Sequence, residues 1–359
     1  MMSITPDIYD AVVIGAGLTG ALVAHHLAEA SLNVVVLEAK EAPGGIAGRG
    51  MGLALLGTPE PYVALQTRLG VDKGRQAWEL TRQNLDLLTA ILHQLHQEAT
   101  LVGSFRLADD AVEAGLWQES ALLLRQDLYA AEVDEAQDYG YTIGMRTADD
   151  VAFDPTALVT ALLDHPHITL EYETEAQSIH PHSGHSSEPA ILHVWARQHY
   201  IQTRNVVLAN GPHAIRLQRS LGSILHSLPM HAVDFRNAGA LSTPLVVQQG
   251  RVVIYAQGRD WRMTGWDNAQ QDALSMLTHV AQRLCPDALV MGRHSWWTAQ
   301  SADGLPIVGQ LPEAPHVYTV NGLGPWGLSW AAVAADRLIG LLVHGEDAGI
   351  LALERFFAP

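Results

Sequence analysis

The residues with the clearest chemical meaning form a glycine run near the start of the sequence, Gly15-Ala16-Gly17-Leu18-Thr19-Gly20. An apolar run at 9–14 precedes it and predicts a short buried strand, and the pattern at 18–31 predicts a helix. The first glycine permits a tight turn, the second lets the backbone approach a pyrophosphate, and the third lets helix and strand pack closely. Free N–H groups at the start of the helix favour bound phosphate. The run therefore predicts a dinucleotide site.

The residue that ends the next predicted strand, at 33–38, supports the same interpretation. Strand, helix and strand form a βαβ unit with a parallel pair, and Glu38 lies 18 residues after Gly20. Its carboxylate can accept hydrogen bonds from both ribose hydroxyls of an adenosine and would repel the 2′-phosphate of NADP. These features alone leave FAD and NAD open.

Two further glycine-rich segments favour FAD. The loop APGGIAGRGMG at 42–52 could bring backbone N–H groups to a second phosphate or a flavin ring, and Arg49 could pair with the pyrophosphate or contact the ring. A surface loop with a solvated arginine is the alternative there. The run GLGPWGL at 322–328 matches a dinucleotide motif formally, but no second strand ending in an acid follows it. We therefore expect it to approach the polar edge of an isoalloxazine ring.

Periodicity outlines the rest of the chain. We expect helices over 76–98, 109–128, 155–164, 268–284 and 328–343, and strands over 102–107, 168–209, 245–266 and 316–320. The first and last parts of the chain have the strand–helix pattern of an α/β nucleotide-binding domain, and β-rich segments lie between them. The first and last segments are therefore expected to share one sheet.

These motifs, in this order, resemble the FAD-dependent D-amino acid oxidase family, which includes glycine oxidase and sarcosine oxidase. The resemblance is specific at 10–52, 206–212 and 303–328, where VVLANGP and DGLPIVG also match segments of the family. It implies an α/β protein whose Rossmann-type, glutathione-reductase-like FAD-binding domain is interleaved with a substrate domain built on an antiparallel β-sheet. The expected FAD domain covers 1–75, 148–215 and 293–359, and the expected substrate domain covers 76–147 and 216–292.

The resemblance also implies a set of FAD-binding residues. Those expected at the ADP half are Gly15, Ala16, Gly17, Leu18, Thr19, Gly20, Glu38, Ala39 and Lys40, with Ala176 near the adenine. Those expected elsewhere along the dinucleotide and at the flavin are Gly45, Arg49, Gly50, Met51, Gly52, Ala209, Asn210, Gly211, Gly322, Gly324, Pro325, Trp326, Gly327 and Leu328. A covalent flavin link would need a cysteine close before Asp303. None is there, so non-covalent FAD is expected.

The departures from the family concern the substrate. Amino acid oxidases of this family usually carry an arginine before the DGLP motif that clamps the substrate carboxylate. The stretch SWWTAQSA at 295–302 contains none, and Pro325-Trp326 stands where some members have a second arginine. Arg293 lies nearby and could substitute. A free amino acid is therefore less favoured than a secondary amine, a larger amino-acid derivative or an intermediate with an apolar part.

Three residues are candidates for the substrate site. Tyr255 fits the place of a strand tyrosine that faces the substrate in the family, Arg262 could supply positive charge, and Trp297 could line an apolar pocket together with Trp296 and Trp326. The alternatives are an ordinary cross-strand aromatic, a solvated arginine and core packing. No acid–base pair is expected, because hydride transfer from an amine needs mainly orientation and a deprotonated nitrogen.

Composition limits the partners. A net charge of −17 disfavours nucleic acid, and 48% hydrophobic residues allow a large core. No signal peptide, membrane span or disulfide framework is visible, so a cytoplasmic, soluble protein is expected, with a small-molecule substrate and a possible homo-oligomer. The single cysteine, Cys285, is expected on a helix and partly buried, and the histidines at 165–167 and 180–185 are expected in solvated loops, with a metal site as a minor alternative.

The function expected is oxidation of a C–N bond of an amine or amino-acid-like substrate to an imine, by hydride transfer to the flavin, with O2 or another electron acceptor. An FAD-binding subunit of a larger complex and a 2-hydroxy acid oxidase or dehydrogenase are the alternatives. An NAD-dependent dehydrogenase is a further one, and it would contain no flavin.

Overall fold

One sheet contains strands from both ends of the chain, as the sequence predicts. The computed structural model describes residues 8–42, 45, 47–181, 191–197, 199–267 and 272–357, so the loop positions 43, 44 and 46 and the histidines in 182–185 lie outside it. Sheet A has the strand order β10-β11-β12-β1-β2-β9, with β19 pairing with β12 and β18 pairing with β19. Its strands are β1 (Tyr9–Ile14), β2 (Val34–Leu37), β9 (Ile168–Glu171), β10 (Ala176–Pro181), β11 (Leu192–Ala196), β12 (His199–Leu208), β18 (Ile307–Gln310) and β19 (Val317–Asn321).

The centre of sheet A is parallel, and this determines where the site lies. β1 pairs in parallel with β2 and β12, and β12 pairs in parallel with β19. The carboxyl ends of these strands therefore meet at one edge of the sheet. The segments that follow them, at 15–20, 38–40, 209–213 and 322–328, are four of the segments expected to bind FAD. In open α/β sheets this edge is where ligands bind.

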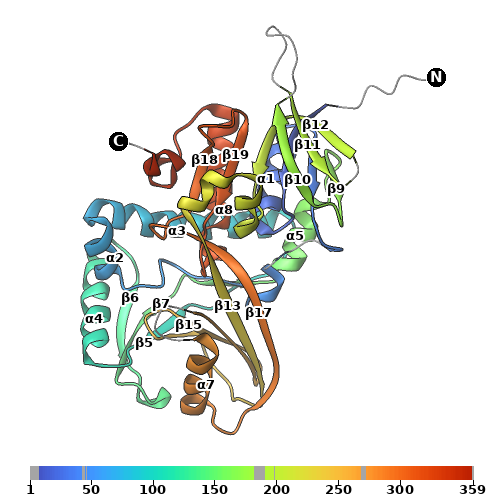
Figure 1. Ribbon diagram of the computed structural model, residues 1–359. Coiled ribbons are helices and arrows are strands. Elements are labelled where there is room, and N and C mark those ends of the chain that lie inside the picture. Colours follow the sequence, from blue (N-terminus) through green and yellow to red (C-terminus); the bar gives the residue numbers. More distant parts are fainter. Residues whose placement is uncertain are drawn as a thin grey trace, which may run out of the picture.

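Helices cover one face of sheet A and form a buried apolar core with it. α1 (Leu18–Glu29) contacts α5 (Pro155–Leu163) and α8 (Ala331–Ile339), and α8 also contacts α3 (Val71–Gln94). The four residues of β2 are all buried, which explains its unbroken apolar sequence. α2 (Tyr62–Leu69) and α4 (Ala111–Gln126) extend this helical layer, and the short α6 (Ala214–Leu217) follows β12. Figure 1 shows this part of the fold in the upper half of the molecule, with α3 below it.

Sheet C forms the lower half of the molecule in Figure 1 and is mostly antiparallel, with the order β17-β13-β16-β15-β14-β5-β7-β6. Its strands are β5 (Ser104–Leu107), β6 (Ala131–Glu135), β7 (Ile143–Thr147), β13 (Leu225–Arg236), β14 (Leu245–Val247), β15 (Val252–Gln257), β16 (Asp260–Trp266) and β17 (Leu289–Ser301). α7 (Ala273–Leu284) packs on β16 and β13. Val252 and Ile254 belong to the core on the α7 side, while Val253 faces the other way, as the period of two requires.

The longest strand pair of sheet C is not in the sequence prediction. β13 and β17 pair along their whole length in an antiparallel ladder, and Figure 1 shows them running side by side from sheet A down to α7. Their sequences, LHSLPMHAVDFR and LVMGRHSWWTAQS, do not alternate cleanly between apolar and polar residues. The predicted domain limit at 293 falls inside β17, and the domain limits as a whole stay a prediction.

Other elements differ from expectation at their ends. The strand expected over 102–107 begins at Ser104, because Gly103 turns the chain with a φ of 57° before β5. The separate strand β4 (Ala99–Leu101), which comes before this turn, belongs to a small sheet with β8 (Val151–Phe153) and β3 (Leu53–Ala54). The helix expected over 328–343 is a 3-10 turn at Gly327–Ser329, then α8, then a π-helical turn at Gly340–His344. Cys285 caps the end of α7 and is buried, and burial raises the pKa of its thiol to about 11.

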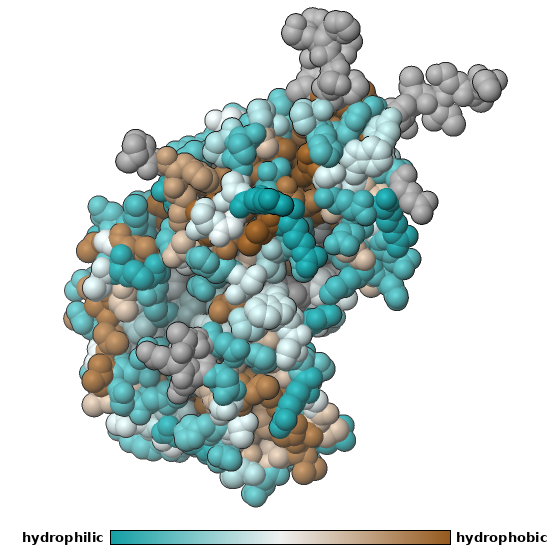
Figure 2. Space-filling model, in the orientation of Figure 1, coloured by the Kyte–Doolittle hydropathy of each residue, from teal (hydrophilic) through white to brown (hydrophobic). Residues whose placement is uncertain are grey.

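The surface is largely polar on the face seen in Figure 2. Within the described ranges, no helix is both long enough and apolar enough to cross a membrane. Three or more histidine, cysteine or acidic side chains do not gather anywhere in the described residues in a way that could hold a metal ion.

Candidate functional site

The first glycine turn has the geometry that a pyrophosphate needs. A Cβ on Gly20 would lie 1.9 Å from the carbonyl oxygen of Gly15, so only glycine lets α1 pack this closely on the turn. A Cβ on Gly17, in contrast, would meet no atom of the described residues within 4 Å, its neighbours in the chain aside. Gly17 is also the N-cap of α1 and provides no side-chain cap. The first N–H groups of the helix are therefore available to an anion.

Glu38 is tied to this turn by its carboxylate. Oε2 accepts a hydrogen bond of 3.0 Å from the N–H of Ala16, and Oε1 accepts one of 3.0 Å from the N–H of Lys40. A carboxylate has about four acceptor positions, so two remain for a ligand. The end of β2 and the glycine turn are thus held together, with Glu38 on the wall of the cavity described next.

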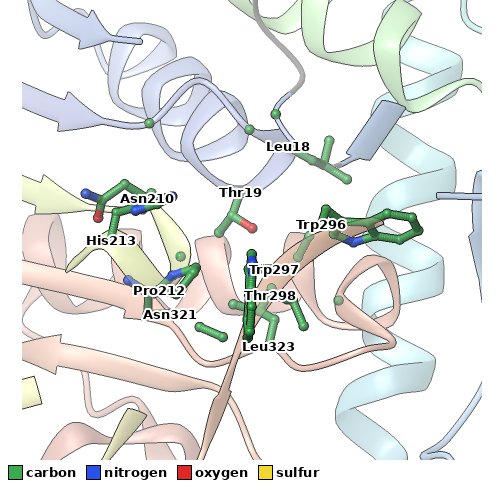
Figure 3. A pocket seen from close by; sticks show the side chains of 18 of the residues that line it. Leu18, Thr19, Asn210, Pro212, His213, Trp296, Trp297, Thr298, Asn321 and Leu323 are labelled. Carbon is green, nitrogen blue, oxygen red and sulfur yellow. The ribbon is translucent and has the colours of Figure 1, made fainter. Parts of the chain in front are cut away.

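A cavity of about 720 Å³ runs along the carboxyl edge of sheet A and reaches sheet C. Its wall contains most of the residues predicted to bind the cofactor: Gly15, Gly17, Leu18, Thr19, Glu38, Ala39, Lys40, Gly45, Gly50, Met51, Ala176, Ala209, Asn210, Gly211, Gly322, Gly324, Pro325, Trp326, Gly327 and Leu328. Figure 3 shows Leu18 and Thr19 on one side, Asn210, Pro212 and His213 on another, and Trp296 and Trp297 reaching in from β17. Segments distant in the sequence therefore form a single continuous site.

Some predicted cofactor residues are not on this wall. Ala16 and Gly20 support the turn from behind, and a Cβ on Gly52 would lie 2.1 Å from the carbonyl oxygen of Phe153. Arg49 is exposed and is not among the residues that line the cavity.

The second glycine run is held by the end of β17 and by the loop that follows. The N–H of Gly324 donates to the carbonyl of Ala299 at 2.9 Å, and the hydroxyl of Thr298 donates to the carbonyl of Gly324 at 3.3 Å. Asp303, in the DGLP motif, forms a two-pronged ion pair with Arg355, with N–O distances of 2.8 and 2.9 Å. Burial raises the pKa of Asp303, but the Arg355 bonds outweigh it, and the pKa is lowered. Sequence reasoning missed Arg355, which lies 52 residues away.

The cavity also contains polar atoms without a protein partner. Asn210 Oδ1, Asn321 Nδ2 and Trp326 Nε1 are buried, have no hydrogen-bond partner among the described residues and belong to wall residues. Buried polar groups are normally paired, so these atoms indicate a polar ligand. With the open space at Gly17 and the free helix start, the residues fit a dinucleotide whose phosphates lie at α1.

The structure separates the three predicted substrate residues. Trp297 lines the cavity, as do Trp296 and Trp326. Tyr255 lies on the same face of β15 as Val253 and packs with Trp326 and its neighbours, directly across the ladder from Arg262, but it is not on the wall. Tyr255 is thus placed as a cross-strand aromatic, the alternative weighed from the sequence.

Arg262 does not present a free cation. Its Nε and Nη2 donate to the two carboxylate oxygens of Asp234 at 2.6 and 3.0 Å, and its Nη1 donates to the carbonyl of Gly50 at 3.1 Å. His294 also contacts Asp234. Arg262 therefore anchors the loop at Gly50 from β16, which makes it a positioning residue. Arg293 is exposed and is not on the cavity wall.

The part of the wall that sheet C supplies is uncharged. Its described residues are Met230, Val253, Thr264, Trp296, Trp297, Thr298 and Ala299. The charged wall residues, Glu38, Lys40, Glu175 and Arg216, come from sheet A and the segments around it, and Arg216 pairs with Glu175 at 3.7 Å. Sequence reasoning missed Met230, Val253 and Thr264, because only the pairing of the strands shows which of their faces meets the cavity.

Together, a βαβ glycine turn, an acid at the end of β2 and a cavity that continues to a second sheet define a dinucleotide-dependent oxidoreductase. The comparisons with known proteins make the class specific. The family model of FAD-dependent oxidoreductases matches residues 10–341, and the chain belongs to this family. Its cofactor is therefore FAD, and the expected family and fold class are confirmed.

Individual relatives and solved structures agree with this family. The chain is 27% identical, over 95% of its length, to the tRNA 5-methylaminomethyl-2-thiouridine biosynthesis bifunctional protein MnmC of Hydrogenovibrio crunogenus, and the match covers 56% of that protein. The chain thus spans little more than half of this relative. Glycine oxidase from Geobacillus kaustophilus has a TM-score of 0.78 at 20% identity, covering 97% of this chain and 98% of that one. L-proline dehydrogenase from P. horikoshii has a TM-score of 0.77 at 16% identity, covering 97% and 96%.

Proposed function

We propose that this FAD-dependent oxidoreductase oxidises a C–N bond of an amine that carries an apolar or aromatic group and no free carboxylate next to the reacting carbon. One observation carries the proposal: the described residues of sheet C that line the cavity are uncharged, and three tryptophans stand at this end. A buried carboxylate needs a partner, because an unpaired charge away from water is costly. An amine in its neutral form has no such need.

The roles of the residues follow from their positions. We assign phosphate binding to the start of α1 and ribose binding to Glu38. The glycine run at 322–328 and the loop at Gly50 and Met51 are assigned to the flavin. Bound FAD would supply the acceptor for a hydride from the carbon next to the nitrogen, and with loss of a proton from the nitrogen the amine would become an imine. Trp296, Trp297 and Met230 would exclude water and orient the substrate by packing, which is the main requirement of this step.

The names of relatives support an amine without deciding which one. The matched relative of Hydrogenovibrio crunogenus is named for a methylaminomethyl group, which is a secondary amine, and the structural neighbours are named for glycine and proline. The acidic sequence, with 38 acidic against 21 basic residues, supports a small molecule over RNA as the substrate here. We also propose that FAD is bound non-covalently, that O2 or another acceptor takes the electrons, and that the protein can form a homo-oligomer. We propose the cytoplasm as its compartment, because free buried thiols such as that of Cys285 are common in reducing compartments.

A matched pair of compounds tests the proposal. The FAD-loaded protein is mixed without oxygen with N-methylbenzylamine, and separately with N-methylphenylglycine, which differs by one α-carboxylate. We expect the amine to bleach the flavin absorbance about tenfold or more faster, because the carboxylate finds no cation on the part of the wall that sheet C supplies. Faster bleaching by the carboxylate compound would contradict the proposal.

The same assay separates the alternatives. Mandelate reports oxidation of a 2-hydroxy acid, and bleaching by mandelate alone would replace the amine by that chemistry. A yellow protein that none of the three compounds bleaches would favour the FAD-binding subunit of a larger complex.

A further inference from the structure

A fully buried arginine lies just behind the cavity wall. Arg106, on β5, is 0% exposed, and its guanidinium carbon is 5.5 Å from the ring centre of Trp78, 5.8 Å from that of Trp117 and 5.2 Å from that of Trp326. Trp326 is itself a wall residue of the cavity, and Arg106 is not. The cation therefore lies one side-chain layer from the site, among aromatic faces that attract positive charge.

The charge of Arg106 is not neutralised by direct contact. Its Nη1 donates to the carbonyl of Thr58 at 3.1 Å and its Nη2 to the carbonyl of Leu56, while Nε has no partner in the part of the chain that the structure describes. No carboxylate in the described chain lies within ion-pair distance of it, although Asp150 interacts with it over a longer range. Burial lowers the pKa of Arg106 to about 10, so the group stays protonated at neutral pH.

The nearby acids are engaged with other groups. Asp150 is buried and accepts from the N–H of Leu56 at 2.6 Å and from the hydroxyl of Thr147 at 2.7 Å. Glu113 accepts from the indole N–H of Trp117 at 3.1 Å. Asp150 therefore opposes the charge of Arg106 only over a longer range and without a direct ion pair, while the guanidinium lies over the ring of Trp326.

The same arginine fixes the segment at 55–58, which follows β3 and whose Leu55 lines the cavity. Besides the two carbonyl groups held by Arg106, the N–H of Leu55 donates to Ser329 Oγ at 2.8 Å and that of Gly57 to Thr81 Oγ1 at 2.7 Å. Side chains from three other elements, β5, the 3-10 turn at Gly327–Ser329 and α3, thus hold this segment.

We propose that Arg106 is a positioning residue of the FAD site with an electrostatic role: it holds the wall formed by Leu55 and Trp326, and its unpaired charge behind that wall favours electron uptake by the bound cofactor. The reduced cofactor carries more negative charge than the oxidised one, so a nearby cation stabilises it. Because the cation is buried, solvent and salt screen it little. The proposal rests on FAD occupying this cavity and is independent of which amine, if any, is the substrate.

Two variants at this position separate the charge from the structural role. Arg106→Met removes the charge and keeps much of the bulk, while Arg106→Lys keeps the charge and loses donors. The midpoint potential of FAD in the full chain is measured by anaerobic dye titration, without substrate, together with thermal unfolding. We expect Arg106→Met to shift the reduction equilibrium about tenfold or more towards oxidised FAD. We expect Arg106→Lys to stay near wild type in potential while unfolding at a lower temperature.

A third variant and a control complete the test. Asp150→Asn keeps an oxygen that accepts from the N–H of Leu56 and removes the negative charge that opposes Arg106. The midpoint potential should therefore rise, opposite to the shift in Arg106→Met. If Arg106→Met does not bind FAD, the result for Asp150→Asn decides whether the proposal holds. Arg146→Met removes a half-exposed cation from the adjacent strand β7, where Arg146 pairs with Asp134, and should leave the potential unchanged. Unchanged potentials in both Arg106→Met and Asp150→Asn would overturn the proposal, and so would an equal shift in Arg146→Met.

Discussion

Single residues set the fit between the first turn and a ligand, and two glycines of one motif do so in different ways. The Cβ position of Gly20 is blocked by the backbone of Gly15, so Gly20 is needed for the fold of the turn. The Cβ position of Gly17 is free of atoms from the described residues and lies at the cavity wall, so we expect Gly17 to be needed only when a ligand is present. Within one glycine motif, Gly20 is thus required by the fold and Gly17 by the ligand.

Alanine variants should separate these two requirements. Gly20→Ala should lower the free energy of unfolding of the FAD-free protein by about 1–3 kcal/mol, because backbone must move. Gly17→Ala should leave the FAD-free protein as stable as wild type and bind FAD about tenfold or more weakly, because a methyl group stands where the phosphate approaches. Thermal unfolding and FAD titration measure the two effects.

Gly115 in α4 provides the control. Its Cβ position is also open, but it is exposed on a helix away from the cavity. Gly115→Ala should leave FAD binding unchanged and add stability of up to about 1 kcal/mol. If Gly17→Ala bound FAD as tightly as the control, the assignment of the pyrophosphate to this turn would be wrong.

At the scale of elements, the turn between β17 and β18 directly follows the strand end that is hydrogen-bonded to the second glycine run. The carboxylate of Asp303 forms an ion pair with Arg355. It also accepts hydrogen bonds from the N–H of Leu305 at 3.1 Å and from the hydroxyl of Ser301 at 3.0 Å. The pKa of Asp303 is lowered from 3.8, so its contribution to stability is fully present above pH 3.8 and is lost as the pH falls below it.

Asp303→Asn should therefore be less stable than wild type at neutral pH, by about 1–3 kcal/mol, the range for hydrogen bonds to a charged group. The difference should shrink as the pH is lowered through 3.8, because wild type then loses the same charge. Urea unfolding at several pH values measures both. Arg68→Met is the control: Arg68 contacts the backbone of Asp303 from an exposed position, and its loss should cost less than about 0.5 kcal/mol. A difference between Asp303→Asn and wild type that did not change with pH would contradict the role of the ion pair.

The sequence predicted those parts of the site that depend on short-range spacing. The glycine turn, Glu38 and the run at 322–328 follow or end strands, and a parallel sheet brings strand ends together whatever the rest of the chain does. Arg355 and Arg106 could not be found this way, because their partners lie about 50 residues away along the chain. Arg262 shows the same limit: its position on β16 was predicted, but its pairing with Asp234 depends on the register between β13 and β16.

At the scale of the whole molecule, the site exists only when distant segments meet. β1 and β2 come from the beginning of the chain, β12 from its middle and β19 from near its end, and all of them contribute their carboxyl ends to one cavity. Sheet C then closes the cavity with an uncharged wall. The account of the function therefore depends on one claim, that this cavity holds FAD without a covalent bond.

The visible spectrum of the purified protein, recorded before and after acid precipitation, tests that claim most directly. The account predicts a yellow protein with one FAD for each chain, and all of the flavin free in the supernatant after precipitation. A colourless protein that takes up no added FAD would contradict the claim, and flavin that stays with the precipitate would contradict its non-covalent part.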